Sequence, residues 1–366
     1  MNMKKFGFLS LGLIGGSIAL AIRQICPNAH ILAYARRQST LDEAAAAGAI
    51  DMGTTEINEL FSDCDMIFLC GPVAVNNNFL EQLAPLLGDK TIITDVGSVK
   101  GTIHEAVSRL GLERHFIGGH PMAGSEKTGF ANANPILLEN AYYILTPTES
   151  VPEEAVADYY SLVKKMGALP LILSCKEHDY VTAAISHVPH LVAAALANLV
   201  HDHDSSEETM KMIAAGGFKD ITRIASSSPD MWESICMSNT ENIADLLDDY
   251  IASLQTVSRA VRSGQKGFTY DLFTASKEYR DSFADLPRGP IKKVFACYVD
   301  IPDETGSIAS LATLLAKADI SIKNIGIIHN RDFEEGVLRI EFYEQSALDE
   351  ATTLLQSLQY TIHQRK

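Results

Sequence analysis

The apolar positions of the first half of the chain follow two alternating patterns. Short apolar runs predict buried strands, and they lie at residues 5–11, 30–34, 66–70 and 91–95. Helical spacing fills the intervals between them, at residues 13–25, 40–47, 75–87 and 101–110. Shorter strands are expected at residues 116–118, 142–146 and 169–173. Strands alternating with helices predict a mostly parallel, doubly wound α/β sheet of the Rossmann type over residues 1–174.

The pattern changes at residue 175. From there to residue 284 the apolar residues recur at helical spacing only, which predicts an all-helical domain. One long amphipathic helix is expected over residues 230–261. A helical domain so rich in alanine and leucine is expected to pack against a copy of itself, so we predict a homodimer.

A third region follows a short linker. Residues 285–290 read Asp-Leu-Pro-Arg-Gly-Pro, a composition typical of linkers. The expected strands beyond it lie at residues 293–300, 320–328, 336–343 and 360–363, with helices at 306–317 and 347–358. This βαββαβ order predicts a ferredoxin-like domain over residues 291–366.

Composition excludes several classes of function. The chain of 366 residues has 30 lysines and arginines against 46 aspartates and glutamates, a formal charge of −16. Such a charge argues against binding to nucleic acid or to an anionic membrane surface. The six cysteines form no CxxC pair, which favours free thiols in a reducing cytoplasm. No uninterrupted apolar stretch of about 18 residues is present, so no membrane span is expected.

A glycine-rich turn joins the first expected strand to the first helix. Its sequence, Ser-Leu-Gly-Leu-Ile-Gly over residues 10–15, matches the dinucleotide fingerprint GxGxxG with serine in the first position. The alternative is a plain structural turn. The turn also argues against a signal peptide, because its glycines interrupt the apolar N-terminal run. The residues expected to contact a cofactor are Ser10, Gly12, Leu13, Ile14, Gly15 and, after another strand, Gly71.

The residues after the second expected strand bear on cofactor preference. An enzyme that uses NAD usually has an acid about twenty residues beyond the glycines, whereas this chain has Ala35 followed by Arg36 and Arg37. Two guanidinium groups suit a 2′-phosphate, so the sequence favours NADP while leaving NAD open. The alternative is a solvated basic loop.

Two further segments bring candidate chemistry to the carboxyl ends of strands. Ser98 follows the strand at residues 91–95, and His120 lies in a glycine-flanked loop after the next strand. A histidine is suited to accept a proton near neutral pH. In the helical region, Lys219 and Arg223 are four residues apart and are expected to share one helix face. That face suits an anionic substrate, with a solvated basic stretch as the alternative.

Five of the eleven histidines lie between residues 178 and 203, which raises the question of a zinc site. We exclude it, because Pro189 separates His187 from His190 and no HExxH motif is present. No metal is expected.

Together these segments resemble the prephenate dehydrogenase (TyrA) family over about residues 5–285. The matching motifs are GLIGGS at 12–17, DVGSVK at 95–100, GGHPMAGSEKTG at 118–129, HDY at 178–180, SHVPH at 186–190 and GGFKDITRIA at 216–225. The resemblance implies a Rossmann domain, a helical dimerisation domain and oxidative decarboxylation of prephenate to 4-hydroxyphenylpyruvate with hydride transfer to NAD(P)+, in tyrosine biosynthesis.

The resemblance also implies roles for individual residues. His120 matches the catalytic histidine that polarises or deprotonates the ring hydroxyl, and Ser98 matches the serine that orients it. His190 matches a residue that contacts the substrate side chain, which favours prephenate over arogenate. Arg223 matches the arginine that binds a substrate carboxylate, and Lys219 and Asp220 support it. Glu126 matches an acid in the ionic network at the site entrance, and Ser125 beside it is a further substrate-binding candidate.

Residues 292–366 resemble an ACT domain, a module that binds amino acids at a strand–helix turn. Its candidate ligand-binding residues are Gly306, Ser307 and Asn324, and tyrosine is the expected effector. The alternative is a dimerisation module without a ligand. For the whole chain, a tyrosine-regulated prephenate dehydrogenase is expected first; the alternatives are an arogenate dehydrogenase and a catalytically inactive sensor of nucleotides and amino acids.

Overall fold

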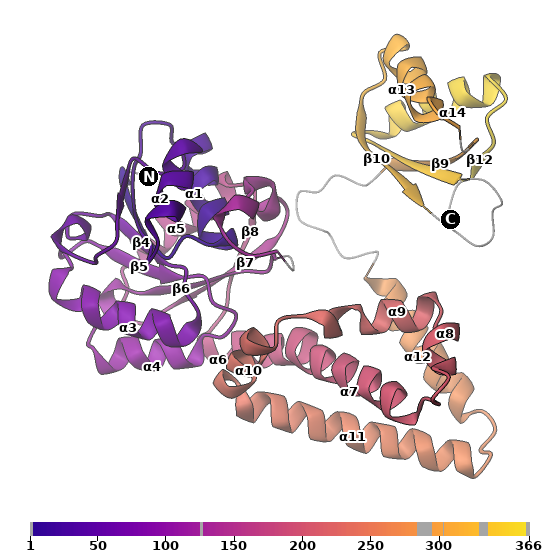
Figure 1. Ribbon diagram of the computed structural model, residues 1–366, viewed down its shortest axis with the longest axis horizontal. Coiled ribbons are helices and arrows are strands. Elements are labelled where there is room, and N and C mark those ends of the chain that lie inside the picture. The colour runs from indigo at the N-terminus through magenta and orange to yellow at the C-terminus, as the bar shows by residue number, and fades with distance from the viewer. Residues whose placement is uncertain (1–2, 125–126, 284–294, 303, 329–335, 364–366) are drawn as a thin grey trace. The chain divides into compact units, whose positions relative to one another are not determined.

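The computed structural model describes residues 3–124, 127–283, 295–302, 304–328 and 336–363. The chain forms two compact units, Met1–Phe283 and Ala284–Lys366, and each is described by itself. Figure 1 shows the elements of both units.

The first unit is built on a five-stranded parallel sheet. Its strand order is β3-β2-β1-β4-β5, where the strands are Met52–Thr54, His30–Tyr34, Lys5–Leu9, Met66–Leu69 and Ile92–Asp95. One face is covered by α1 (Leu13–Ile25), α2 (Gln38–Ala46) and α5 (Glu153–Lys165), and the other by α3 (Val73–Leu83) and α4 (Gly101–Arg109). Burial on both faces explains why the strands read as continuous apolar runs. The doubly wound parallel sheet is thereby confirmed.

A second sheet extends this core. Strands β6 (Ile117–Pro121) and β7 (Tyr142–Pro147) pair antiparallel, β8 (Leu169–Ile172) joins β7 in parallel, and a bridge from Ile93 to Phe116 connects the two sheets. Two elements were not predicted, the three-residue strand β3 and the helix α5. The pattern of α5 does indicate a helix, because its buried residues Tyr159, Leu162 and Val163 recur on one face.

The last part of the first unit is helical. Its α-helices are α6 (Cys175–Thr182), α7 (Val188–His203), α8 (Thr209–Ile213), α9 (Gly216–Thr222), α10 (Pro229–Ser238), α11 (Thr240–Arg262) and α12 (Phe268–Ser282). The single helix expected over residues 230–261 is wrong, because the chain breaks at Asn239 with φ −134° and ψ 39°. The buried side-chain amide of Asn239 donates a hydrogen bond of 2.7 Å to the Asp179 carbonyl. This hydrogen bond stabilises the break between α10 and α11.

Helices α6 and α7 are joined by a π-helical turn, Ala183–His187, into one run from Cys175 to His203. By length and composition alone this run could cross a membrane, although it contains no unbroken apolar stretch of about 18 residues. Histidines and charged side chains interrupt it. Three of those polar side chains, His178, Asp179 and His187, are buried within the first unit. Length and apolar composition are equally features of a helix that packs against protein.

The second unit contains β9 (Phe295–Ile301), α13 (Ser307–Lys317), β10 (Ile322–Ile328), β11 (Gly336–Phe342), α14 (Gln345–Ser357) and β12 (Ile362–His363). Its sheet is antiparallel in the order β10-β11-β9-β12. Apolar residues of both helices and all four strands share one core. The element order is the one expected from the sequence.

Candidate active site

The glycine turn lies where β1 ends and α1 begins. Ser10, in the place of the first fingerprint glycine, has φ +74°, a left-handed conformation that glycine adopts more easily. Gly12 precedes α1 without any side-chain cap, and a Cβ there would meet no atom within 4 Å. Gly15 has no such space, since a Cβ would lie 2.9 Å from Cys70. The turn therefore leaves open backbone and free helix N–H groups, which fits a bound phosphate.

The other cofactor candidates lie at the ends of the two strands beside β1. Arg36 and Arg37 are exposed directly after β2, and Ala35 before them is buried. Gly71 follows β4, and its N–H donates to Asn76 Oδ1 over 2.9 Å. The structure thus brings all eight residues predicted to bind the cofactor to one edge of the sheet, at the point where the strand order reverses.

A buried ion pair organises the neighbouring loops. Asp95 ends β5 and pairs with Lys100, and both side chains are inaccessible to solvent. Asp95 also accepts hydrogen bonds from the N–H of Gly97, at 2.9 Å, and of Gly119, at 3.2 Å. Each of these glycines immediately precedes a candidate catalytic residue, Ser98 or His120. One carboxylate therefore fixes both segments.

His120 is linked to the helical part of the unit through a second histidine. Its Nδ1 lies 2.8 Å from Nε2 of His178, which belongs to α6. His178 Nδ1 in turn lies 2.7 Å from Oδ1 of Asp179. The same carboxylate accepts the N–H of Lys100 on Oδ1, at 2.8 Å, and the N–H of Gly101 on Oδ2, at 2.7 Å. A continuous set of hydrogen bonds thus runs from His120 to the start of α4.

Burial keeps these histidines uncharged near neutral pH. Desolvation lowers the pKa of His120 well below 6.5, and repulsion from His178, Lys100 and His187 adds to this effect. Burial also lowers the pKa of His178, although its hydrogen bond to Asp179 opposes the shift. A neutral imidazole can accept a proton, which is what a general base requires.

Two more histidines face Trp232, the residue of α10 that packs against α7. The ring of His190 stacks on the indole with a centroid separation of 3.7 Å, and its Nδ1 donates to the Ser186 carbonyl over 2.9 Å. His187 meets the same indole edge-on at 6.0 Å, and burial lowers its pKa to about 4. The hydrogen bond of His190 uses Nδ1 and leaves Nε2 available for other contacts.

The basic candidates lie on neighbouring elements. Lys219 and Asp220 belong to α9, which ends at Thr222, and Arg223 begins a 3-10 turn, Arg223–Ser226. The expectation that Lys219 and Arg223 share one α-helix face is therefore wrong, since the helix changes type between them. Both side chains are exposed, and their elements pack against α7, which carries His190. Ser125 and Glu126 lie outside the described residues.

In the second unit, the predicted regulatory residues occupy a strand–helix turn and a strand. Gly306 precedes α13 with φ +95°, Ser307 is its first residue, and a Cβ on Gly306 would meet no atom within 4 Å. Asn324 lies in β10, is exposed, and accepts the N–H of Ile325 over 2.9 Å. The conformation of Gly306 is one that other residues rarely adopt.

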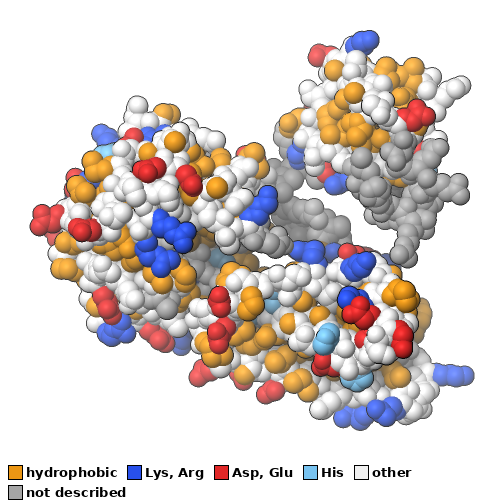
Figure 2. Space-filling view, viewed as in Figure 1, with side chains coloured by type: hydrophobic (Ala, Val, Ile, Leu, Met, Phe, Trp, Pro, Cys, Tyr) orange, Lys and Arg blue, Asp and Glu red, His pale blue; other side chains and the backbone are white. Residues whose placement is uncertain are grey.

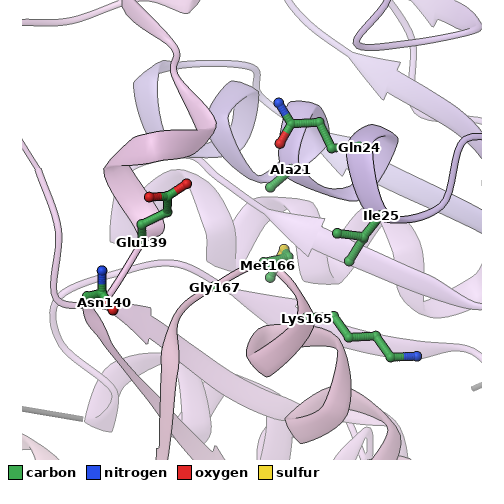
Figure 3. A pocket seen from close by; sticks show the side chains of 8 residues that line it. All are labelled: Ala21, Gln24, Ile25, Glu139, Asn140, Lys165, Met166 and Gly167. Atoms are coloured by element: carbon green, nitrogen blue, oxygen red, sulfur yellow. The ribbon is translucent and has the colours of Figure 1, made fainter. Parts of the chain in front are cut away.

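A separate hollow of about 290 Å³ lies at the far end of α1 from the glycine turn. Figure 3 shows that the side chain of Lys165 there extends away from that of Glu139. The hollow contains none of the predicted site residues. In the described parts of the chain, no group of three or more His, Cys, Asp or Glu side chains is arranged to hold a metal ion.

A doubly wound sheet with a glycine turn at its switch point, next to histidines supplied partly by a helical domain, is the architecture of a dinucleotide-binding dehydrogenase. Comparisons with known proteins give the particular family. Family models described as "Prephenate dehydrogenase, nucleotide-binding domain" and "Prephenate dehydrogenase, dimerization domain" match residues 18–171 and 174–275. The prephenate dehydrogenase of Bacillus subtilis is 38% identical over 346 residues, which cover 93% of each chain. The chain belongs to the prephenate dehydrogenase family.

Solved structures agree with this assignment. The prephenate dehydrogenase of A. aeolicus, in complex with hydroxyphenyl propionate and NAD+, has a TM-score of 0.73 at 30% identity and covers 77% of this chain and 99% of that one. The arogenate dehydrogenase of Synechocystis has a TM-score of 0.70 at 31% identity, with coverage of 76% and 99%. The comparisons therefore support a nicotinamide cofactor and a helical dimerisation domain.

Four residues that build this site were not predicted as functional residues. Asp95 and Lys100 are the ends of the DVGSVK motif, and His178 and Asp179 belong to the HDY motif. A signal was available for Asp95, which ends the otherwise apolar strand β5, because a buried charge requires a partner. The partners, however, lie in other elements and are visible only in the folded chain.

Proposed function

We propose that the chain catalyses the oxidative decarboxylation of prephenate to 4-hydroxyphenylpyruvate. The observation that carries the proposal is the neutral, buried His120, hydrogen-bonded to His178 beside the sheet edge that fits a dinucleotide. Family membership gives the substrate class. The nicotinamide supplies the acceptor for the hydride that leaves the carbinol carbon of prephenate.

The chain's own residues act on the substrate. His120 Nε2 accepts the proton of the ring hydroxyl, and Ser98 orients that hydroxyl. Loss of carbon dioxide then leaves an aromatic phenol, which makes the overall step effectively irreversible. Arg223 binds a substrate carboxylate, with Lys219, Asp220, Ser125 and Glu126 as further contributors, and His190 contacts the side chain.

The test is a direct assay with prephenate and with arogenate, following the absorbance of the reduced nicotinamide. We expect turnover with prephenate and a lower kcat/KM with arogenate, because His190 matches the family residue that contacts the prephenate side chain. The Synechocystis neighbour keeps arogenate as the second candidate. Preference for arogenate would favour that candidate, and turnover of neither would leave an inactive sensor.

For the cofactor we propose NADP. The support is the exposed pair Arg36 and Arg37 at the end of β2, after the buried Ala35. No carboxylate occupies the place of the usual ribose-binding acid, so a 2′-phosphate would meet positive charge rather than repulsion.

Replacing both Arg36 and Arg37 by serine should lower kcat/KM for NADP while changing kcat/KM for NAD little. Each charge-assisted contact with phosphate contributes about 1.5–3 kcal/mol, so the expected loss is at least about tenfold. The matched control is Arg109→Ser, an exposed arginine of α4. Strict dependence of the unmodified chain on NAD would contradict the proposal.

We propose a homodimer formed through the helical part of the first unit. Large apolar side chains are exposed along its helices, among them Leu199, Met237, Ile251, Leu254, Val261 and Phe273. Figure 2 shows apolar side chains on the visible face of this region. Such an extent of exposed apolar surface is typical of protein interfaces. We further propose a cytoplasmic location, in keeping with six free cysteines.

For the second unit we propose an ACT domain of ferredoxin-like fold that binds tyrosine. The supports are its βαββαβ order, its sheet order β10-β11-β9-β12, and the open turn at Gly306 before α13. A helix N-terminus favours the carboxylate of an amino acid. Ser307 and Asn324 are the side chains proposed to contact the ligand.

Tyrosine should inhibit the full chain, and a chain ending at residue 287 should be active but less sensitive. The coupling expected for such regulation is about 1–3 kcal/mol, or 5- to 150-fold in tyrosine affinity. Tyrosine resembles the product, so calorimetric stoichiometry is needed to separate a regulatory site from the catalytic one. Equal stoichiometry and equal inhibition of the two chains would contradict the proposal.

A further inference from the structure

We infer that Asp179 is a positioning residue that sets the tautomer of His120 through His178, so that His120 presents an unprotonated Nε2 to the substrate. The inference rests on the proposed function for its catalytic meaning. Its structural content, the position of two protons, can be measured without any assay of activity.

The order of donors and acceptors from Asp179 to His120 allows one arrangement of protons on the two neutral imidazole rings. A carboxylate only accepts hydrogen bonds, so the bond between Asp179 Oδ1 and His178 Nδ1 places a proton on that nitrogen. A neutral His178 then has a lone pair on Nε2, which must accept from His120 Nδ1. The proton of a neutral His120 is therefore on Nδ1, and its Nε2 is free to act as a base.

The carboxylate of Asp179 is fixed in its ionised form and orientation. Burial opposes its charge, but hydrogen bonds from His178 and from the N–H of Lys100 and Gly101 hold its pKa below 3.8. The two backbone donors stand at the N-terminus of α4, where the helix dipole favours a negative charge. A Cβ at position 101 would lie 3.0 Å from Asp179 Oδ2, so glycine leaves room for this contact.

The same contacts join the two parts of the catalytic machinery. Asp179 belongs to α6 in the helical part, whereas Lys100 and Gly101 close the loop that carries Ser98. One carboxylate therefore orients the base through His178 and holds the end of the loop that supplies the serine. If Asp179 only capped α4, its contacts with the N–H groups of Lys100 and Gly101 would be explained, but its hydrogen bond to His178 would not.

Asp179→Asn is the discriminating substitution. An amide must turn its NH2 toward one of the three donors around Asp179. If the NH2 replaces Oδ1, it opposes the N–H of Lys100 and donates to His178 Nδ1, which reverses the chain and places the proton of His120 on Nε2. If it replaces Oδ2, it opposes the N–H of Gly101 and leaves the chain unchanged. Each orientation loses one backbone hydrogen bond, so the tautomer and kcat of this variant are measured together.

The tautomers are read from long-range proton–nitrogen spectra of the full chain labelled with ¹⁵N-histidine, with His120 assigned by its loss in His120→Gln. We expect a proton on Nδ1 of His120 in the unmodified chain. In Asp179→Asn the tautomer and kcat should change together: a proton moved to Nε2 should lower kcat by about 10²- to 10⁴-fold, with little change in KM for prephenate, and a proton kept on Nδ1 should leave kcat near its normal value. A change in one without the other overturns the inference.

Two further variants keep the test decisive. His178→Leu leaves the backbone contacts of Asp179 in place and removes the histidine chain, so kcat should fall even if Asp179→Asn does not fold. Asp204→Asn is the matched control, because Asp204 accepts the N–H of Met210 and of Lys211 at the start of α8 without a role in the site. It should retain full kcat.

A proton on Nε2 of His120 in the unmodified chain overturns the inference, as does full kcat in His178→Leu. Failure of the proposed function is a different result, namely absence of turnover by the unmodified chain with the predicted tautomer present.

Discussion

Replacing His120 by alanine is expected to lower kcat for prephenate by about 10²- to 10⁴-fold, the usual contribution of a general base. The affinity for the nicotinamide cofactor should change little, because the glycine turn that fits the pyrophosphate lies at the end of β1 and His120 belongs to β6. Steady-state kinetics and cofactor titration by fluorescence measure the two effects. The matched control is His201→Ala, an exposed histidine of α7, which should retain its activity.

The pH profile gives an independent check on His120. The active form of the base is unprotonated, and burial lowers its pKa well below 6.5. The unprotonated form therefore persists as the pH falls through 6.5, and kcat/KM should decline only at more acidic pH. An acid limb at or above pH 6.5 would show that His120 is not the desolvated base described above.

Replacing Lys100 by methionine is expected to lower the free energy of unfolding of the first unit by about 3–5 kcal/mol. The substitution leaves the carboxylate of Asp95 buried without its cation, while the hydrogen bonds from Gly97 and Gly119 only partly compensate. Urea denaturation followed by the fluorescence of Trp232 reports on this unit, since Trp232 is the only tryptophan of the chain.

The control for this measurement is Lys90→Met, which removes the same charge from an exposed position. Its effect should stay within about 0.5 kcal/mol. If Lys100→Met costs no more than about 1 kcal/mol, the range of exposed ion pairs, then the buried pair with Asp95 does not organise the two loops as proposed.

Local patterns were sufficient to predict most of the first unit and its site. The parallel sheet followed from apolar runs separated by helical spacing, because burial on both faces leaves no polar alternation. The glycine turn and the segments of Ser98 and His120 followed from their place near strand ends, because parallel strands bring their carboxyl ends to one edge. The loop expected for His120 is wrong, because His120 lies within β6, paired with Ile144 of β7. The second unit's order of elements was likewise predicted from its pattern.

Contacts between segments that are distant in the sequence determined where the helices of the helical region end. The helix expected over residues 230–261 breaks at Asn239, because its amide reaches the Asp179 carbonyl 60 residues away. The shared α-helix face of Lys219 and Arg223 failed because the helix changes type at Thr222.

The sequence by itself determined the sheet, the glycine turn and the positions of the candidate catalytic residues along the chain, since each depends on near neighbours in the chain. Only the tertiary structure decided how His120 is held. Its partner His178 lies 58 residues further along, and the carboxylate that orients His178 also caps a helix 78 residues before it. Hydrogen-bond direction depends on which donor meets which acceptor, and that is settled only when these segments pack together.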